Sequence, residues 1–430
     1  MRGKIDRVSA RSVLPDLTPL RVSPAYRRLW TGQTISAFGQ QMALVAISFE
    51  AYHLTGESFA VGLIGLFGLL PLVLGGLYGG TLVDAFDRRK VALVSALGLW
   101  ACSLALVVHV LAGWERVEVL YAIVAVQSAM FAVNNPARAA MLPRLLPMKV
   151  LPAANALGMA SFTLSFTVGS LLGGSLIATG GVRAVYIVDA VLFTAAIYSI
   201  VRLPSLPPGE RAPVPGFRSV LDGLGFLRQA PNLRTSFVLD MCAMVLAQPR
   251  ATFPALAATV YLAGGKGTDG AWVLGLLQAA PAIGSFLAFC VSGWISRVHR
   301  HGIAIVVAVL AYGIAVALAG MSAIGLPGAL WLGVTLLALS GSADMISSAY
   351  RSTMLQTAAP DEMRGRMQGV FTVVVAGGPR LGDFLMGSLA SVFGEGQAMM
   401  IGGVLCVAGV GLAVVSARRF LAYDARHPMP

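Results

Sequence analysis

Seven charged side chains stand inside long apolar stretches of this sequence, where a charge is costly. Five are acids and two are bases: Glu50, Asp189, Asp240, Asp344, Asp383, Arg250 and Arg380. A charge near the centre of a bilayer costs roughly 2.5–3.5 kcal/mol, so such residues usually face protein or water. A carboxylate there can bind and release a proton as water or a ligand enters and leaves its surroundings. Asp240 and Asp344 lie closer to the middle of their stretches than Glu50 and are the leading candidates for this chemistry.

The remaining acids have a less specific interpretation. Glu50 stands near the outer end of its stretch, where we expect half-exposure and a structural role, with proton coupling as the alternative. Arg380 and Asp383 are three residues apart on one predicted helix. A structural ion pair between them is therefore favoured over a proton relay through Asp383. Asp189 has no obvious partner within its own stretch and stays ambiguous.

Two prolines, Pro249 and Pro254, interrupt the stretch that holds Arg250. Proline lacks a backbone donor and breaks the helical hydrogen-bond ladder, which predicts a bent helix. An unpaired guanidinium at such a bend favours an anionic or carbonyl-rich ligand. Neutralisation by Asp240 is the alternative, but ten residues of helix would separate the two by about 15 Å along the axis. The candidates for ligand binding or gating are Arg250, Arg380 and Arg138.

Twelve apolar stretches, each long enough to cross a membrane, carry or adjoin these residues. A membrane span needs about 20 mostly apolar residues. The sequence is 57% hydrophobic and only 12% charged, with a mean hydropathy of +0.78. We therefore predict an all-α membrane protein with 12 transmembrane helices. Their expected bounds are 30–52, 59–83, 91–112, 118–141, 151–178, 183–201, 234–262, 271–296, 302–323, 328–350, 367–391 and 397–417.

Basic residues gather in alternate gaps between these stretches. Of 31 Lys and Arg residues, 26 fall in the two terminal segments and in every second gap, and this count places Arg351 in a loop. Positive charge is typical of short cytoplasmic loops, so we expect a multi-pass protein of the cell membrane with both termini in the cytoplasm. The net charge of +12 then reflects this bias and contact with anionic lipid. We expect no nucleic-acid partner, because the chain has no basic face of a soluble module.

The two halves of the chain repeat at an offset of 213 residues, and a Pro-rich linker separates them. The matched pairs are Gly80 with Gly293, Arg138 with Arg351, Pro147 with Pro360, Gly169 with Gly382, and Gly174 with Gly387. A second match, Gly65 with Gly275, needs an offset of 210. Such a duplication predicts two pseudo-twofold related six-helix bundles. The expected segments are 1–29 (cytoplasmic), 30–202 (first bundle), 203–233 (cytoplasmic linker), 234–417 (second bundle) and 418–430 (cytoplasmic tail).

Several short motifs carry a family resemblance. Residues 80–90 (GTLVDAFDRRK) are similar to the loop between spans 2 and 3 of the major facilitator superfamily, and residues 360–366 (PDEMRGR) resemble its loop between spans 10 and 11. Residues 54–56 (LTG), 135–138 (NPAR) and 154–157 (ANAL) add to this likeness. From about residue 25 to residue 418, the chain resembles the branch that contains bacterial enterobactin exporters and proton-driven drug exporters.

The resemblance implies a conformational lock at the inner end of the second span. Its motif residues are Gly80, Asp84, Arg88 and Arg89. The Asp84 carboxylate would hold the two halves together in the outward-facing state through the start of span 11. The basic residues of the motif equally mark the inner membrane face. The chain departs from the family at Ala85 and Asp87, where the motif has arginine and glycine, and at Ser170, where antiporters have proline, so antiport rests on overall similarity.

The resemblance also implies a function. It points to a secondary active transporter, a proton-coupled exporter of a siderophore or an amphipathic drug that works by alternating access. An importer or symporter, a lysophospholipid carrier and a non-transporting membrane receptor are the alternatives. The sequence has no hydrolase, zinc or Walker motif, so we expect neither an enzyme nor direct use of ATP. We expect no cofactor, a proton gradient as driving force, a small-molecule substrate, contact with protons and lipid, and a monomer.

Overall fold

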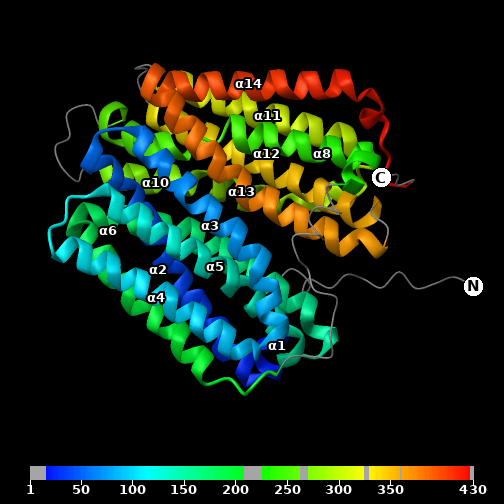
Figure 1. The fold of residues 1–430 in the computed structure, drawn as a ribbon. Helices are drawn as coiled ribbons and strands as arrows, with labels where there is room; N and C mark the ends of the chain where they lie inside the picture. Colours follow the sequence, from blue (N-terminus) through cyan, green and yellow to red (C-terminus); the bar gives the residue numbers. More distant parts are fainter. Residues whose placement is uncertain (1–15, 208–224, 262–269, 324–328, 359–360, 427–430) are drawn as a thin grey trace, which may run out of the picture.

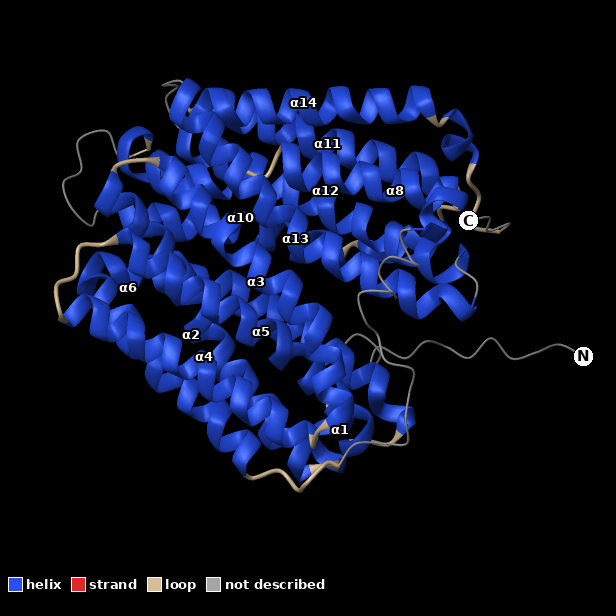
Figure 2. Cartoon of the chain, in the orientation of Figure 1, coloured by secondary structure: helices blue, strands red, loops and turns tan. Residues whose placement is uncertain are grey.

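The structure is a computed structural model that describes residues 16–207, 225–261, 270–323, 329–358 and 361–426. Side chains are described within these ranges except at 77, 80, 81, 84, 296 and 361–373. Every regular element in this part of the chain is helical (Figure 2). The all-α class expected from the sequence is therefore confirmed.

Capping residues set the ends of the helices in the first half. Helix α2 begins after Ser23, whose hydroxyl accepts a hydrogen bond from Tyr26 N at 3.1 Å, and it ends at Gly56, which has a φ of 71°. Glycine adopts this left-handed conformation without strain, which suits it to end a helix. The elements are α1 (Thr18–Val22), α2 (Pro24–Thr55), α3 (Ser58–Ala85), α4 (Arg88–Leu111), α5 (Val117–Leu145), η2 (Met148–Val150) and α6 (Leu151–Val201).

Helix α6 consists of two arms that join at Gly181, where φ is 69° and ψ is 177°. The first arm begins beside the start of α2, since Trp30 Nε1 donates to Leu157 O at 3.4 Å. The second arm ends beside the same part of α2, where Gly32 contacts Ser199. The chain therefore doubles back at Gly181, and the arms correspond to the stretches expected at 151–178 and 183–201.

Proline interrupts the first long element of the second half, as predicted. Pro249 and Pro254 lack a backbone N–H, and residues 231–260 form short α, π and 3-10 segments instead of one helix. The elements are α8 (Pro231–Met241), η3 (Cys242–Leu246), η4 (Arg250–Thr252), α9 (Phe253–Ala255), η5 (Leu256–Val260), α10 (Ala271–Cys290), η7 (Ser292–Arg297), α11 (His301–Ser322), α12 (Ala329–Ala358), α13 (Asp361–Phe393), α14 (Glu395–Ser416) and η8 (Arg418–Ala422).

Eight segments of the described chain are long and apolar enough to cross a bilayer. They are Ser58–Gly76, Arg88–Leu111, Val117–Leu145, Met148–Val201, Ala271–Cys290, His301–Ser322, Ala329–Ala358 and Glu395–Ser416. Met148–Val201 contains both arms of α6. The stretches expected at 30–52, 234–262 and 367–391 are not in this set. The second is broken by proline, and the other two, in α2 and α13, carry polar side chains that line a cavity described below.

Figure 1 shows helices α2–α6 gathered on one side of the molecule and α8–α14 on the other. Two glycine crossings join the sides. A Cβ atom at Gly62 of α3 would lie 3.2 Å from Gly387 Cα of α13, and one at Gly275 of α10 would lie 3.0 Å from Gly174 Cα of α6. The two crossings are related by the offset of 213 residues, which matches Gly62 with Gly275 and Gly174 with Gly387. Gly275 is thus the counterpart of Gly62, and the offset of 210 expected for it does not hold at this contact.

The described segments nearest the two termini lie toward the same end of the helices. In Figure 1, α1 lies at the lower end of the group α2–α6, and the red segment at η8 lies at the right end of the group α8–α14. Gly62, by contrast, is in the first turns of α3. Helix α3 begins just after Thr55, at the end of α2 that is far from α1. The crossings and the terminal segments therefore lie at opposite ends of α2.

Candidate functional site

A cavity of about 730 Å³ lies between the two sides of the molecule. Residues of α2, α3, α4, α5, α6, η4, α10 and α13 line it. The lining begins beside the glycine crossings, at Gly65 and Asp383, and reaches Trp30 and Arg138 toward the other ends of their helices. Cavities of about 300–1,000 Å³ hold drug-sized ligands. This cavity is therefore the candidate binding site.

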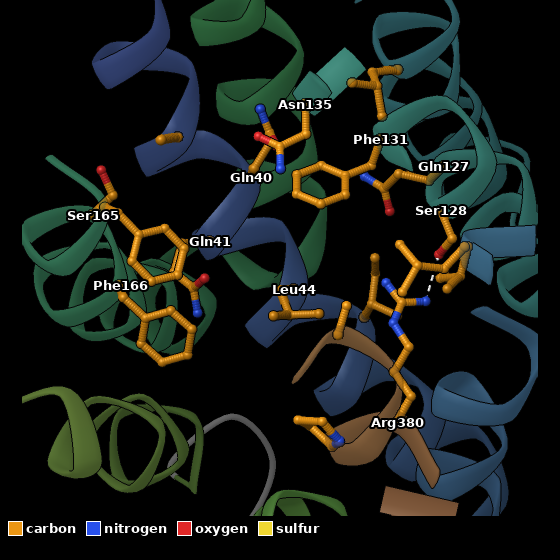
Figure 3. Close-up of a pocket in the computed structure, with 18 of the residues that line it drawn as sticks. Gln40, Gln41, Leu44, Gln127, Ser128, Phe131, Asn135, Ser165, Phe166 and Arg380 are labelled. Atoms are coloured by element: carbon orange, nitrogen blue, oxygen red, sulfur yellow. Dashed lines mark hydrogen bonds between the residues drawn. The ribbon is translucent and has the colours of Figure 1, made fainter. Parts of the chain in front are cut away.

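Amides and aromatic rings make up much of the described lining (Figure 3). The amide residues are Gln33, Gln40, Gln41, Gln127, Asn134, Asn135 and Gln278, and the aromatic residues are Trp30, Phe131, Phe162 and Phe166. Figure 3 shows Phe131 on α5 and Phe166 on α6 facing the cavity from different sides. Amides both donate and accept hydrogen bonds, and aromatic rings stack on planar groups. The lining suits a ligand that combines rings with polar substituents.

Four charged side chains belong to the described lining: Arg138, Arg250, Arg380 and Asp383. The three arginines chosen from the sequence for ligand binding therefore meet in one cavity. The break around Pro249 brings the Arg250 guanidinium to 5.0 Å from the centre of the Phe166 ring, a cation–π contact. Three guanidiniums against one carboxylate make the cavity electropositive, which favours an anionic ligand. Their role in binding stays a prediction.

Arg380 does not pair with Asp383, and the expected ion pair within α13 is wrong. Arg380 Nη1 donates to Ser128 Oγ on α5 at 2.8 Å (Figure 3), and no ion pair within 4.0 Å joins the two described side chains. Gly68 of α3 makes this possible, because a Cβ atom there would clash with Arg380 Nη1. Asp383 Oδ1 is buried without a hydrogen-bond partner among the described residues. Arg380 therefore links the two sides across the cavity.

Asn134 positions Arg138 at the cavity wall. Arg138 Nη1 donates to Asn134 Oδ1 at 3.3 Å. The amide nitrogen of Asn134 donates in turn to Ala92 O at 3.0 Å and Ser95 Oγ at 2.9 Å on α4. Asn134 is 2% exposed, so its orientation is fixed. Sequence reasoning singled out Arg138 but missed Asn134, whose position one turn before the arginine was the available signal.

The two leading proton-coupling candidates, Asp240 and Asp344, share one cation, Arg351. Asp240 forms a close ion pair with Arg351, and Asp344 Oδ1 lies 3.5 Å from Arg351 Nη2. The side chain of Asp240 is 3% exposed and that of Asp344 is 38% exposed. Asp240 is thus the enclosed partner and Asp344 the accessible one. This Asp240–Arg351–Asp344 triad is outside the described lining of the large cavity.

The placement of Arg351 in a cytoplasmic loop is wrong. Helix α12 continues to Ala358, so Arg351 is seven residues before its end, and only 6% of the side chain is exposed. A charge count cannot separate a loop from the last turns of a long helix. The match between Arg351 and Arg138 at the offset of 213 was the sequence signal for its helical setting.

Glu50 is buried, which corrects the half-exposure expected for it. It is 9% exposed, and its carboxylate accepts a hydrogen bond from Tyr186 Oη at 2.5 Å. His109 Nε2 lies 3.3 Å from the other carboxylate oxygen. Asp189, which lacked a partner in its own stretch, accepts a hydrogen bond from Ser103 Oγ at 2.6 Å. These partners lie on different helices, and sequence reasoning missed them.

The predicted lock falls partly outside the described residues. Gly80 and Asp84 belong to α3, but the side chain of Asp84 is not described, so the lock stays a prediction. Arg88 Nη1 donates to Ala140 O at 3.4 Å and Arg89 Nη2 to Val201 O at 2.6 Å. In this structure, both described contacts stay within the first half.

Asp87, a departure from the family motif, caps α4. Its carboxylate accepts from Arg89 N at 2.9 Å, Ser205 Oγ at 2.5 Å and Leu206 N at 3.3 Å. Partial burial of Asp87 favours its neutral form, but these hydrogen bonds outweigh burial and hold the pKa of the carboxyl below its ordinary value. Asp87 thus joins the start of α4 to the chain after α6.

Comparison with known proteins identifies the family. The sequence pattern of the transmembrane secretion effector family matches residues 15–427. The chain belongs to this family. The enterobactin exporters of Shigella boydii and of Escherichia coli O1:K1 are each 27% identical to it over 420 residues, covering 96% of this chain and 97% of theirs. The resemblance to the major facilitator superfamily is confirmed, and this family member is a multi-pass inner-membrane transporter, not an enzyme.

Solved structures of other transporters share the fold of this family member. The nucleoside transporter NupG has a TM-score of 0.68 at 14% identity, covering 93% of this chain and 98% of its own. The peptide transporter POT in complex with sulfate has a TM-score of 0.72 at 12% identity, covering 94% and 96%. A bacterial homologue of the iron transporter ferroportin in an inward-facing state has a TM-score of 0.67 at 15% identity, covering 93% and 99%.

Proposed function

We propose that this protein exports a small anionic aromatic molecule of the catecholate siderophore class, driven by protons that flow inward. The observation that carries the proposal is the electropositive cavity, in which Arg138, Arg250 and Arg380 face one described carboxylate, Asp383. The names of the relatives, enterobactin exporters at 27% identity, support the direction of transport and the substrate class.

The substrate class follows from the chemistry of the lining. A deprotonated catechol presents adjacent oxygens that a guanidinium fork can bind in a bidentate manner. Its ring can stack on Phe131 or Phe166, which face the cavity (Figure 3). The amides then satisfy the carbonyl and N–H groups of an amide-linked ligand. A cationic drug would be repelled by the three guanidiniums, so a cationic amphipathic drug is disfavoured as the substrate.

We further propose that transport proceeds by alternating access between two six-helix halves, with twelve spans and both termini in the cytoplasm. The halves comprise residues 30–202 and 234–417, joined by a cytoplasmic linker. The two glycine crossings, which the offset of 213 residues interconverts, support a pseudo-twofold relation. The working unit of the proposal is a monomer.

The same proposal assigns this structure to the inward-facing state. The two glycine crossings, Gly62–Gly387 and Gly174–Gly275, lie at the helix ends that are far from α1. The charge bias assigns these helix ends to the outer face of the membrane. Arg380 reinforces this closure through its hydrogen bond to Ser128 in the opposite half. An anionic substrate bound to Arg380 would compete with Ser128 and so weaken the outer closure.

Proton coupling in the proposal rests on the Asp240–Arg351–Asp344 triad. When both carboxylates are ionised, the triad carries one net negative charge in the protein interior, and protonation of one carboxylate removes it. Asp344 is the exchanging member, because its side chain is 38% exposed and its contact with Arg351 is the longer one. Asp240 remains the fixed counterion of Arg351.

Efflux from cells tests the proposed substrate class. In a bacterium that makes enterobactin but lacks its own exporter, the wild-type protein should restore secretion of the siderophore. Arg250→Gln should lower secretion about tenfold or more, since a hydrogen bond to a charged group contributes about 1.5–3 kcal/mol. Arg300→Gln is the matched control, because Arg300 is exposed and outside the cavity lining. Secretion that stays absent with the wild-type protein, or is insensitive to Arg250→Gln, contradicts the proposal.

A further inference from the structure

A second group of ionisable side chains lies inside the first half, outside the described cavity lining. Glu50 on α2, His109 on α4 and Tyr186 on the second arm of α6 meet there, and we call them the Glu50 cluster. Tyr186 Oη donates to Glu50 Oε2 at 2.5 Å, and His109 Nε2 lies 3.3 Å from Glu50 Oε1. His109 and Tyr186 are fully buried, whereas Glu50 keeps 9% exposure. The three side chains thus form a built, enclosed site with one accessible member.

The charge of the Glu50 cluster is not balanced by a permanent cation. No lysine or arginine of the described chain forms an ion pair with Glu50. Asp189, one turn from Tyr186 on the same helix, adds a second buried carboxyl group, held by Ser103. Two further titratable groups at the nearby helix ends, Tyr52 and Glu395, are partly buried, and Glu395 accepts a hydrogen bond from Ser58 Oγ at 3.0 Å. The remaining charged groups at these ends and loops are exposed: His53, Glu57, Glu115, Arg116, Glu118 and Arg183.

The charges of its three side chains determine how the Glu50 cluster takes up a proton. With Glu50 ionised and both His109 and Tyr186 neutral, the cluster holds one negative charge in a low-dielectric interior. One added proton makes it neutral, either as a carboxylic acid or as an imidazolium–carboxylate pair. Burial penalises an uncompensated charge far more than a paired or neutral group. Histidine exchanges protons in the physiological pH range. The cluster is therefore suited to bind one proton.

The cluster is close to the membrane face opposite α1. Glu50 is five residues before the end of α2 at Thr55, and His109 is two residues before the end of α4 at Leu111. Tyr186 follows the turn at Gly181 by five residues. At 1.5 Å per residue, all three are within about 8 Å of a helix end along the axis. These positions place the Glu50 cluster nearer to this face than to the α1 end of the helices.

We propose that Glu50, His109 and Tyr186 form a proton-binding site that is loaded from the outer face and is separate from the substrate cavity. The proposal rests on the proposed function, because it assigns uptake of an outer proton to the first half of the exporter. Helix α2 connects the two sites: it carries Glu50 and, two turns or more earlier, Gln40 and Gln41 of the cavity lining. Protonation at Glu50 thereby acts on a helix that also contacts the substrate.

Infrared titration of the full-length protein in lipid vesicles tests the site without any substrate. Histidine is ring-labelled with ¹³C, and acid-induced difference spectra are recorded for the wild type, Glu50→Gln, His109→Gln and Tyr186→Phe. We expect a buried one-proton signal that Glu50→Gln abolishes and that His109→Gln shifts in midpoint or abolishes. Tyr186→Phe should keep the signal and raise its midpoint by about 1–2 pH units, the shift expected when a carboxylate loses one hydrogen-bond donor. His53→Gln is the matched control, because His53 is exposed on the same helix as Glu50.

Two results would overturn the proposal. One is a signal that persists unchanged in both Glu50→Gln and His109→Gln. The other is siderophore export by these variants with the same dependence on external pH as the wild type. If the wild-type protein exports no catecholate at all, the proposed function fails, whereas the infrared titration still decides whether the Glu50 cluster binds a proton.

Discussion

Removal of Arg351 should destabilise the protein more than removal of either carboxylate that it contacts. Arg351 is the only cation that the described ion pairs give to Asp240 and Asp344. Arg351→Gln leaves both carboxylates facing each other without compensation. Breaking a buried ion pair by removing one partner costs about 3–5 kcal/mol. We expect the free energy of unfolding to fall by this amount.

The two carboxylates should differ in a predictable order. Asp240→Asn keeps Arg351 compensated by Asp344, which lies 3.5 Å away, so no buried charge is left unpaired and the loss should stay below the value of about 3–5 kcal/mol expected for Arg351→Gln. Asp344 is 38% exposed, and pairs with solvent access contribute only about 0–1 kcal/mol. Asp344→Asn should therefore have the smallest effect on stability, although the proposal gives it the largest effect on proton-driven accumulation.

A double-mutant cycle makes the test quantitative. Unfolding of purified protein in mixed micelles is measured for the wild type, Arg351→Gln, Asp240→Asn and the double variant. Removing Asp240 should relieve part of the repulsion in the Arg351→Gln background, so the double variant should recover about 1–3 kcal/mol relative to the sum of the single losses. Strict additivity, or an Asp240→Asn loss as large as that of Arg351→Gln, would refute the shared-cation account.

Three further predictions concern other contacts. Asp87→Ala should lower the free energy of unfolding by about 1 kcal/mol through loss of the α4 cap. Because the folded-state pKa of Asp87 is depressed, the cap should contribute fully above the unfolded-state pKa and lose its contribution as pH falls through the folded-state pKa. A stability advantage of the wild type that survives in strong acid would refute this prediction. Ser128→Ala removes the acceptor of Arg380 and should raise the accessibility of the outer end to a membrane-impermeant thiol reagent, measured at a cysteine introduced for Ser58, which is 2% exposed beside the Gly62–Gly387 crossing; unchanged labelling counts against the closure by Arg380. Gly68→Leu should displace the Arg380 guanidinium and reduce siderophore efflux, with Gly76→Leu as the control at a position with open space, and equal efflux in both variants would show that the space beside Gly68 is not needed.

Local sequence was sufficient for several features of the fold. The break at Pro249 and Pro254 follows from missing backbone donors, and the structure shows it. The turn near residue 181 follows from a gap between apolar stretches, although its left-handed glycine was not singled out. The three cavity arginines were recognisable because a charge inside an apolar helix has few places to face. In each case, the decisive information lay within a few residues of the feature.

Contacts between distant helices were beyond the sequence. The i, i+3 spacing of Arg380 and Asp383 permits an ion pair, but Gly68 on another helix offers the arginine a path to Ser128 instead. Glu50 is buried because His109 and Tyr186, 59 and 136 residues later, meet it in space. Neither outcome depends on a local propensity. Both depend on contacts with helices that are distant in the sequence.

The central claim is that two halves rock about the cavity, and pulsed electron paramagnetic resonance tests it most directly. Spin labels are placed at exposed positions, with one pair at Glu115 and Phe393 on the proposed outer face and another at Lys149 and Arg300 on the inner face, in a background without the four native cysteines. Distances are recorded in lipid vesicles at neutral and at acidic pH, with and without enterobactin. The account predicts that the outer distance lengthens while the inner one shortens under one of these conditions. Two distances that stay constant, or that change with the same sign, would contradict it.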